Sequence, residues 1–304
     1  MLMLRSILCP VDCSDQSLHA LRWAVALAAQ NQSRLIVLTA IEPLLAEAAR
    51  ARLGLDLAKA DTQPALREFV KAALPEAAAW IPETAFDVRI GDPSEMILEA
   101  ATREHADLIA VGTYGLGGFR KFLLGSTTDR VLRRTSTAVL AVPLVKTQSV
   151  VLETDGPRFD LQRILMGTDF SEVSTEALRW ATDLAQQLRV PLLLSHVVTP
   201  VAVPARWRSY VAEVEEERTR EARARLETLI RQLKETVASE AVVSLGRPAD
   251  SIASIAEERQ AGLMLLDSWA SGARGRRVRD RLPIGCCAWR TSRSSSCRRT
   301  PMLE

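Results

Sequence analysis

The sequence predicts an α/β fold of two tandem, doubly wound domains, each built on a parallel five-stranded sheet, the second being degenerate or incomplete at its C-terminus. Three observations predict this fold. Short apolar runs alternate with helical patterns along the chain. A long stretch of the first half recurs in the second half. A length of 304 residues is enough for two domains of about 150 residues each.

Five segments in the first half predict strands, four as short apolar runs and Ala85–Ile90 by its alternation of apolar and polar residues. Each segment is followed within two residues by Pro, Gly or Asp, which is typical of strands that end in turns. The segments lie at Ser6–Val11, Arg34–Ile41, Ala85–Ile90, Leu108–Val111 and Ala138–Val142.

Helical patterns separate these strands. Ser14 or Asp15 caps the first helix, Gly54 and Pro64 mark breaks in the second, and Pro93 fits the first turn of the third. This alternation favours a parallel sheet with helices on both faces, because parallel strands need crossover connections. The helices are expected over about 15–30, 44–80 and 94–105, and from residue 126 onward.

The second half repeats the first. Residues 164–200 match residues 7–43 at a constant offset of 157, which pairs Asp12 with Asp169. The pentapeptide ALRWA at 20–24 recurs unchanged at 177–181. This register indicates a tandem duplication. The expected organisation is a first domain over 1–145, a linker over 146–160 and a second domain over 161–304.

The second copy departs from the first near its end. Alignment of the fourth strands puts Asp267 in place of Gly112, where a carboxylate would oppose a phosphate group. The loop that follows is rich in arginine, and the tail from Cys286 has no apolar run resembling the first half's AVLAVP. We therefore expect a degenerate site and a missing or borrowed fifth strand in the second half.

A glycine-rich string lies between the fourth and fifth strands of the first half. It reads Gly112-x-x-Gly115, nine residues, Gly125-Ser126. Glycines let a backbone approach a ligand closely, and the free N–H groups at a helix start favour an anion. The string lacks the lysine of a P-loop and the spacing of G-x-G-x-x-G. Phosphate binding is one interpretation, and a loop followed by an ordinary capped helix is the other.

The whole string resembles the nucleotide-binding signature of the universal stress protein family. Both halves, over about residues 4–143 and 162–270, resemble domains of that family. The resemblance implies a five-stranded α/β domain that binds ATP or AMP in many members and pairs with another domain through its last strand. It implies a cytoplasmic stress-response protein that binds ATP, with or without Mg²⁺, in its first domain and acts as a regulatory or signalling module. Its expected partners are adenine nucleotide and either a second copy or the chain's own other half.

The resemblance also implies which residues form the site. Asp12 would contact the adenine edge, and Ala40, near the end of the second strand, would pack on the base. Ribose and phosphates would be held by the glycine string and the helix start after it. The complete expected set is Pro10, Val11, Asp12, Ala40, Val111, Gly112, Gly115, Gly125, Ser126, Thr127 and Thr128.

Composition argues against other functions. A net charge of +2 gives no reason to expect a nucleic-acid or membrane partner. The three histidines lie far apart and the five cysteines have no disulfide or metal-binding pattern, so neither a metal site nor a disulfide framework is expected. The N-terminus has no signal-peptide pattern, so a cytoplasmic location is expected.

Two alternatives stay open. A nucleotide-independent dimerisation scaffold would use the same duplicated fold, and an α/β enzyme acting on adenylylated substrates would share the sheet and the loop. No nucleophile or general base with a partner can be named near the loop, so at most weak ATP hydrolysis is expected. Arg120, Lys121 and Arg130 either screen phosphate charge or lie on solvated faces, and Trp23 and Trp180 are expected in the core or between the halves.

Overall fold

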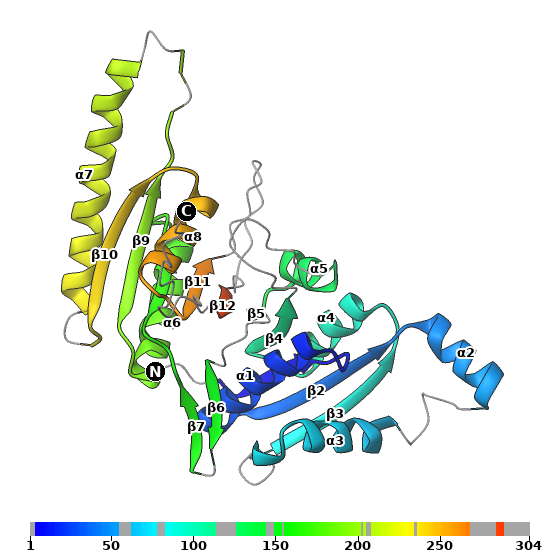
Figure 1. The fold of residues 1–304 in the computed structure, drawn as a ribbon. Helices are drawn as coiled ribbons and strands as arrows, with labels where there is room; N and C mark the ends of the chain where they lie inside the picture. The colour runs from blue at the N-terminus through cyan, green and yellow to red at the C-terminus, as the bar shows by residue number, and fades with distance from the viewer. Residues whose placement is uncertain are drawn as a thin grey trace, which may run out of the picture.

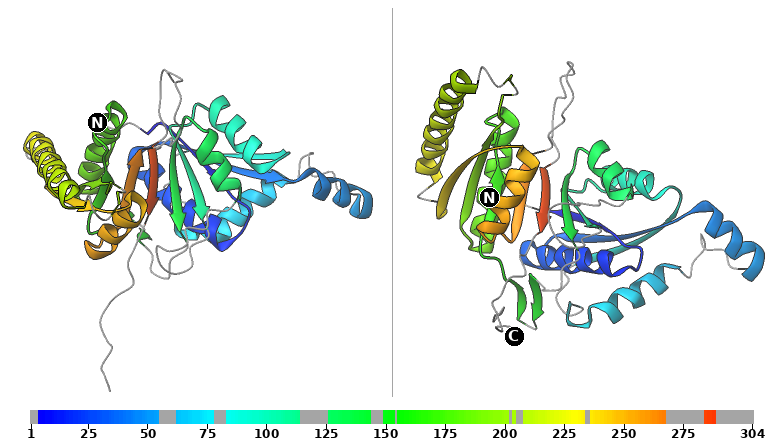
Figure 2. Two further views of the ribbon diagram at one scale, coloured as in Figure 1. Left: turned by 90° about the horizontal axis from the view of Figure 1, so that it is seen from above. Right: turned by 45° about the horizontal axis from the view of Figure 1, so that its top comes forward.

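Two α/β halves follow one another in the computed structural model of the chain (Figure 1). Their strands form one ten-stranded sheet, ordered β10-β9-β8-β11-β12-β5-β4-β1-β2-β3. Helices lie on both faces of each half, which confirms the predicted doubly wound α/β class (Figure 2). The structure describes residues 4–54, 62–77, 83–113, 126–143, 149–153, 155–201, 203–204, 208–233, 236–267 and 284–288.

The first half has its strands in the order β5-β4-β1-β2-β3, and all of its neighbours are parallel. The central strands are apolar on both sides because helices cover both faces, as parallel sheets require. The strands are β1 (Ser6–Pro10), β2 (Arg34–Ile41), β3 (Glu83–Ile90), β4 (Leu108–Thr113) and β5 (Ala138–Pro143). They agree with the expected runs to within two residues.

The helices of the first half begin and end for local reasons. The Ser14 hydroxyl accepts a hydrogen bond from Ser17 N, which caps α1. Gly54, in the left-handed region at φ 65°, ends α2, and Pro64 is tolerated in the first turn of α3. The helices are α1 (Asp15–Asn31), α2 (Pro43–Leu53), α3 (Thr62–Ala73), the 3₁₀ turn η1 (Pro75–Ala77), α4 (Pro93–Arg103) and α5 (Ser126–Arg134).

The second half repeats this plan in the order β12-β11-β8-β9-β10. Ser171 caps α6 as Ser14 caps α1, because the sequence is duplicated there. One long helix, α7, replaces α2 and α3 and lies beside β10 (Figure 1). The elements are β8 (Ile164–Gly167), α6 (Glu172–Leu188), β9 (Leu192–Val198), α7 (Arg208–Leu233), β10 (Ser239–Leu245), α8 (Pro248–Glu258), β11 (Leu263–Asp267) and β12 (Ile284–Ala288).

The fifth strand of the second half corrects the expectation that the tail lacks one. Five residues of the chain's own end form β12, which pairs antiparallel with β11 and parallel with β5. The strand lies between β11 and β5 and runs in the direction of the first half. The sequence IGCCA carries too few large apolar residues to predict a strand by pattern. Backbone hydrogen bonds to β11 on one side and β5 on the other stabilise this strand although its side chains carry little apolar signal.

The segment between the halves forms a hairpin. Strands β6 (Val150–Glu153) and β7 (Gly156–Phe159) pair antiparallel and pack on α1 (Figure 2). The Phe159 ring lies 5.7 Å from the ring of Trp23, centroid to centroid. Aromatic pairs at this distance attract beyond their buried area. The described part of the expected linker thus forms a hairpin that packs on α1.

The two halves contact each other through α1 and α6. The Gln30 side-chain amide donates to the Gln187 carbonyl over 2.8 Å, and these residues stand one repeat offset apart. One apolar cluster contains residues of both helices, with Trp23 buried and Trp180 partly buried against it. The expected packing role of the two tryptophans is confirmed.

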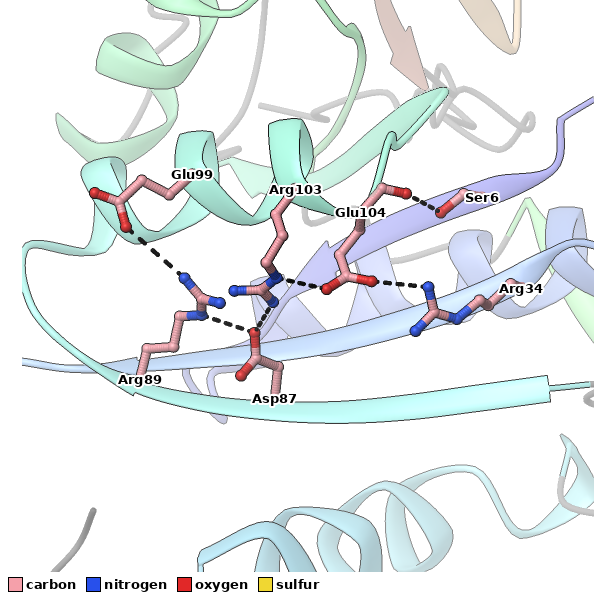
Figure 3. Close-up of polar contacts among 7 residues, drawn as sticks. All are labelled: Ser6, Arg34, Asp87, Arg89, Glu99, Arg103 and Glu104. Carbon is pink, nitrogen blue, oxygen red and sulfur yellow. Dashed lines mark hydrogen bonds and ion pairs between the residues drawn. The ribbon is translucent and has the colours of Figure 1, made fainter.

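A network of charged side chains joins β3, an edge strand of the sheet, to β2 and the end of α4. Asp87 accepts from Arg89 and Arg103, and Glu104 accepts from Arg103 and Arg34, all over 2.7–2.8 Å (Figure 3). Charges on an edge strand discourage pairing with the edge of another sheet. Within the described part of the chain, no helix combines the length and apolar composition needed to cross a membrane.

Candidate functional site

A cavity of about 500 Å³ lies at the carboxyl ends of β1, β2 and β4. The connection after β1 leads to β2 on one side, whereas the connection after β4 leads to β5 on the other side. Open α/β sheets bind ligands at such a switch point. The cavity is lined by Pro10, Val11, Asp12, Cys13, Ser14, Gln16, Ser17, Leu38, Thr39, Ala40, Ile41, Glu42, Leu45, Pro93, Ile97, Val111, Gly112, Thr113, Ser126, Thr127 and Thr128.

Nine of the eleven residues predicted from the sequence line this one cavity. They come from three strand ends and from the start of α5, which are distant in the sequence. The other two, Gly115 and Gly125, lie outside the described residues. Sequence reasoning missed the other lining residues, among them Gln16 and Ser17 at the start of α1 and Pro93 at the start of α4. The sequence signal for these three residues was their position in the first turn of a helix that follows a strand.

Asp12 is the exposed carboxylate of the cavity. Its Oδ1 atom accepts from the Ser14 N–H over 3.0 Å and from the Ser14 hydroxyl over 2.5 Å. Burial raises the pKa of Asp12, but these hydrogen bonds and that of Ser17 lower the pKa by more, so it lies below its ordinary value. Among the described residues, no donor reaches Oδ2. Asp12 is thus ionised at neutral pH with one oxygen open to the cavity.

An apolar wall stands beside Asp12. Ile97 of α4 and Val111 of β4 are almost completely buried, and Leu38 of β2 is fully buried. Ala40 continues the face of β2 that Leu38 belongs to, because side chains alternate along a strand. Because the side chain of Ala40 at the rim is small, the wall leaves room for a flat apolar group next to the Asp12 carboxylate.

Gly112 allows α1 to pack closely against β4 beside the cavity. A Cβ atom at this position would lie 2.5 Å from the carbonyl oxygen of Gln16. Its backbone φ is outside the left-handed region, so the need for glycine comes from the contact alone. Gly112 therefore lets the first turn of α1 lie against the end of β4.

Thr128 connects α5 to β4. Its side chain is buried, and its hydroxyl donates to the Gly112 carbonyl over 3.0 Å. Ser126 and Thr127 precede it and line the cavity at the start of the helix. The first N–H groups of a helix have no partner within the helix and favour an anion. The bond from Thr128 fixes where those N–H groups lie.

Ion pairs bind the arginines of α5 to acidic residues. Arg130 pairs with Asp92 over 3.2 Å, and Arg133 pairs with Asp129 over 2.9 Å. Arg134 pairs with Glu95. Arg130 thus lies on a paired, solvated face, while Arg120 and Lys121 lie outside the described residues.

The equivalent region of the second half has different side chains. Asp169 accepts from Ser171 and Ser174, much as Asp12 does from Ser14. However, Phe170 stands where the first half has Cys13. Leu263 pairs with Ile164 as Leu108 pairs with Ile7, so the strand register puts Asp267 at the place of Gly112. The two copies share a backbone plan but not a site.

The thiol of Cys13 also lines the first-half cavity. Cys13 is the nucleophile there, but burial and the neighbouring Asp12 raise its pKa. In the part of the chain that the structure describes, no group of three or more His, Cys, Asp or Glu residues could hold a metal ion. The cavity offers the carboxylates of Asp12 and Glu42, an apolar wall and a helix start.

Comparison with known proteins agrees with the fold and the duplication. The sequence profile described as the universal stress protein family matches residues 3–143 and again residues 161–298. A universal stress protein of Methanocaldococcus jannaschii is 31% identical over 142 residues, which are 45% of this chain and 81% of the relative.

One solved structure shows the same fold over nearly the whole chain. The crystal structure of a universal stress protein from Archaeoglobus fulgidus covers 94% of this chain and 98% of its own, with 19% identity and a TM-score of 0.56. A universal stress protein crystallised in complex with cAMP covers 47% of this chain and 98% of its own, with 28% identity and a TM-score of 0.34. The chain belongs to the universal stress protein family and carries two tandem copies of its domain.

Proposed function

We propose that the first half binds an adenine nucleotide, ATP above all, in the cavity at the ends of β1, β2 and β4. The observation that carries this proposal is the open Oδ2 atom of Asp12 beside the wall of Ala40 and Val111. A carboxylate can accept from the exocyclic amino group of adenine, and an apolar wall can pack on the face of the ring. The start of α5 lies across the cavity, where phosphate groups would meet free N–H groups.

The cavity's size and charge fit such a ligand. A volume of about 500 Å³ falls within the range of about 300–1,000 Å³ common for small-molecule sites. Mg²⁺, where present, would be held chiefly by the phosphate oxygens, because Asp12 and Glu42 are the acidic residues of the lining. The absence of a paired nucleophile and base among the described lining residues supports a binding role with at most slow hydrolysis.

The proposed role in the cell is that of a regulatory module in a stress response. Nucleotide binding would bridge strand ends, the start of α1 and the start of α5. It would thereby stabilise the first half relative to the second. The expected cytoplasmic location stays a prediction.

Thermal unfolding with and without Mg-ATP tests the proposal. A ligand at 100 times its dissociation constant adds about 2.7 kcal/mol of stability. We expect Mg-ATP to raise the unfolding temperature of the wild type and of Asp169→Ala, but not of Asp12→Ala. Asp169→Ala is the matched control because it removes the equivalent carboxylate in the second half. If Mg-ATP stabilises none of the three, the nucleotide-independent scaffold is the better account.

A further inference from the structure

A second cavity, of about 390 Å³, lies in the second half between the beginning of α6 and the middle of α7. Its floor includes Leu178, which belongs to the apolar cluster between the sheet and these two helices. The cavity of the first half touches the equivalent cluster through Val11 but extends to the cluster under α4 and α5. The second cavity shares the positions equivalent to Val11, Cys13 and Ser17 and extends toward α7 instead. The second cavity is lined by Thr168, Phe170, Ser174, Thr175, Leu178, Ala224, Arg225, Thr228 and Leu229.

The duplication provides an internal reference for this lining. At the offset of 157, Thr168 stands in place of Val11, and Thr175 in place of Leu18. Val11 is buried in the first half. Two aliphatic positions of the first copy are thus hydroxyl-bearing in the second, and both face the cavity. Thr175 is exposed and Thr168 is half-buried, so both hydroxyl-bearing side chains are accessible to a ligand in the cavity.

Arg225 stands at the wall of the cavity in a fixed position. Its guanidinium carbon lies 4.2 Å from the centroid of the Phe170 ring. The same ring stacks on His196 at 4.5 Å with an interplanar angle of 29°. His196 is in turn held by a 2.8 Å hydrogen bond between its Nδ1 atom and the Thr168 carbonyl. Three stacked groups therefore hold the arginine against the sheet.

The charge of Arg225 has no acidic partner among the described residues. Helix α7 is rich in glutamate, and Arg220 of the same helix pairs with Glu217. Among the described residues, Arg225 takes part in no such ion pair. Cation–π contact orients a guanidinium but leaves its N–H donors unused. Arginine donors in a fixed plane match an oxyanion in a bidentate manner.

We propose that this cavity binds a small organic anion, in which a carboxylate or phosphate group meets Arg225 and an apolar body rests on Leu178, Leu229 and the edge of Phe170. Hydroxyl groups of Thr175 and Thr228 flank the expected position of the oxyanion. In the free protein they donate to carbonyls of their own helices, over 3.2 and 2.9 Å. This site lies in the second half and does not include the proposed nucleotide cavity. It gives a ligand of its own to the second half, in which Asp267 stands in place of Gly112.

Ligand-detected NMR on the full chain tests the proposal with two probes, benzoate and phenyl phosphate, and with benzyl alcohol as the neutral control. We expect saturable binding of at least one anionic probe and none of the alcohol. The anion that binds more tightly identifies the oxyanion. If neither anion binds at millimolar concentration, the proposal is wrong.

Variants locate the binding. Arg225→Gln should weaken it at least tenfold, and Thr175→Leu, which restores the side chain of the first copy, should abolish it by filling the cavity. Arg67→Gln is the matched control, because Arg67 also lies over a phenyl ring, at 5.1 Å from Phe86, but borders no part of this cavity. Binding that survives both test variants, or that saturating Mg-ATP removes, would contradict the assignment. Circular dichroism of each variant checks that it is folded.

Discussion

Gly112→Ala should destabilise the first half, although the change adds only one methyl group. The new Cβ would lie 2.5 Å from the Gln16 carbonyl oxygen and 2.6 Å from its carbon, well inside contact distance. Both atoms are backbone at the start of α1, so the helix itself has to move. Overpacking of this kind costs about 1–3 kcal/mol.

One opposing effect has to be subtracted. Replacing glycine with alanine restricts the unfolded chain and stabilises a protein by about 0.4–1 kcal/mol where the backbone conformation is open to both. Gly112 meets that condition, because its φ lies outside the left-handed region. At the middle of the two ranges the clash outweighs this gain and leaves a net loss of about 1.3 kcal/mol.

Differential scanning calorimetry measures this loss as a lower unfolding temperature, by about 2–4 °C for each kcal/mol in a chain of this size class. The matched control is Gly91→Ala. Its Cβ would meet the Met96 side chain at 2.9 Å, and a flexible thioether can move aside. Gly91→Ala is therefore expected to unfold at or above the wild-type temperature. Equal unfolding temperatures for the two variants would show that α1 yields freely and would refute the reasoning.

Two further predictions concern the interface and the pH dependence of stability. Trp23→Ala should lower the free energy of unfolding by about 3–5 kcal/mol, and Trp180→Ala should lower it clearly less, because Trp180 is only half-buried. Calorimetry measures both losses, and equal losses would contradict the asymmetric packing of the two tryptophans. Burial raises the pKa of Asp12, but its hydrogen bonds with Ser14 and Ser17 lower this pKa by more, so the folded-state pKa lies below the unfolded-state pKa. Asp12 therefore stabilises the fold fully at pH values above its unfolded-state pKa. This stabilisation is lost as the pH falls through the folded-state pKa. Urea unfolding between pH 6 and pH 3 should therefore show a shallower acid-induced loss below about pH 4 for Asp12→Asn than for the wild type, and parallel curves would show that Asp12 gains nothing on folding.

Local patterns were sufficient to predict most of the first half. The apolar runs, Ser14 as a cap and Gly54 as a helix end are properties of a few neighbouring residues, and the structure has each of them. The repeat carried these predictions into the second half, where Ser171 caps α6. Element ends differ by one or two residues, which is the usual uncertainty of helix and strand boundaries.

Features that depend on distant contacts could not be predicted in this way. Strand β12 exists through backbone pairing with β11 and β5, and the hairpin β6–β7 rests on α1 through Phe159 and Trp23. Neither segment has the length or the apolar content that a pattern needs. The same holds for Gln16, which borders the cavity because Gly112 lets α1 approach. The stack of Arg225, Phe170 and His196 joins three segments that are distant in the sequence, so no local pattern predicts it.

The number of ATP molecules bound by one chain tests the central claim most directly. Isothermal titration with Mg-ATP should give one site per chain, because the open carboxylate, Gly112 and the apolar wall occur together only in the first half among the described residues. Ala40→Phe, which fills the wall beside Asp12, should remove that site, while Val197→Phe, at the equivalent position of β9, should leave it unchanged. Two sites per chain, or a single site that Val197→Phe removes and Ala40→Phe spares, would contradict the account.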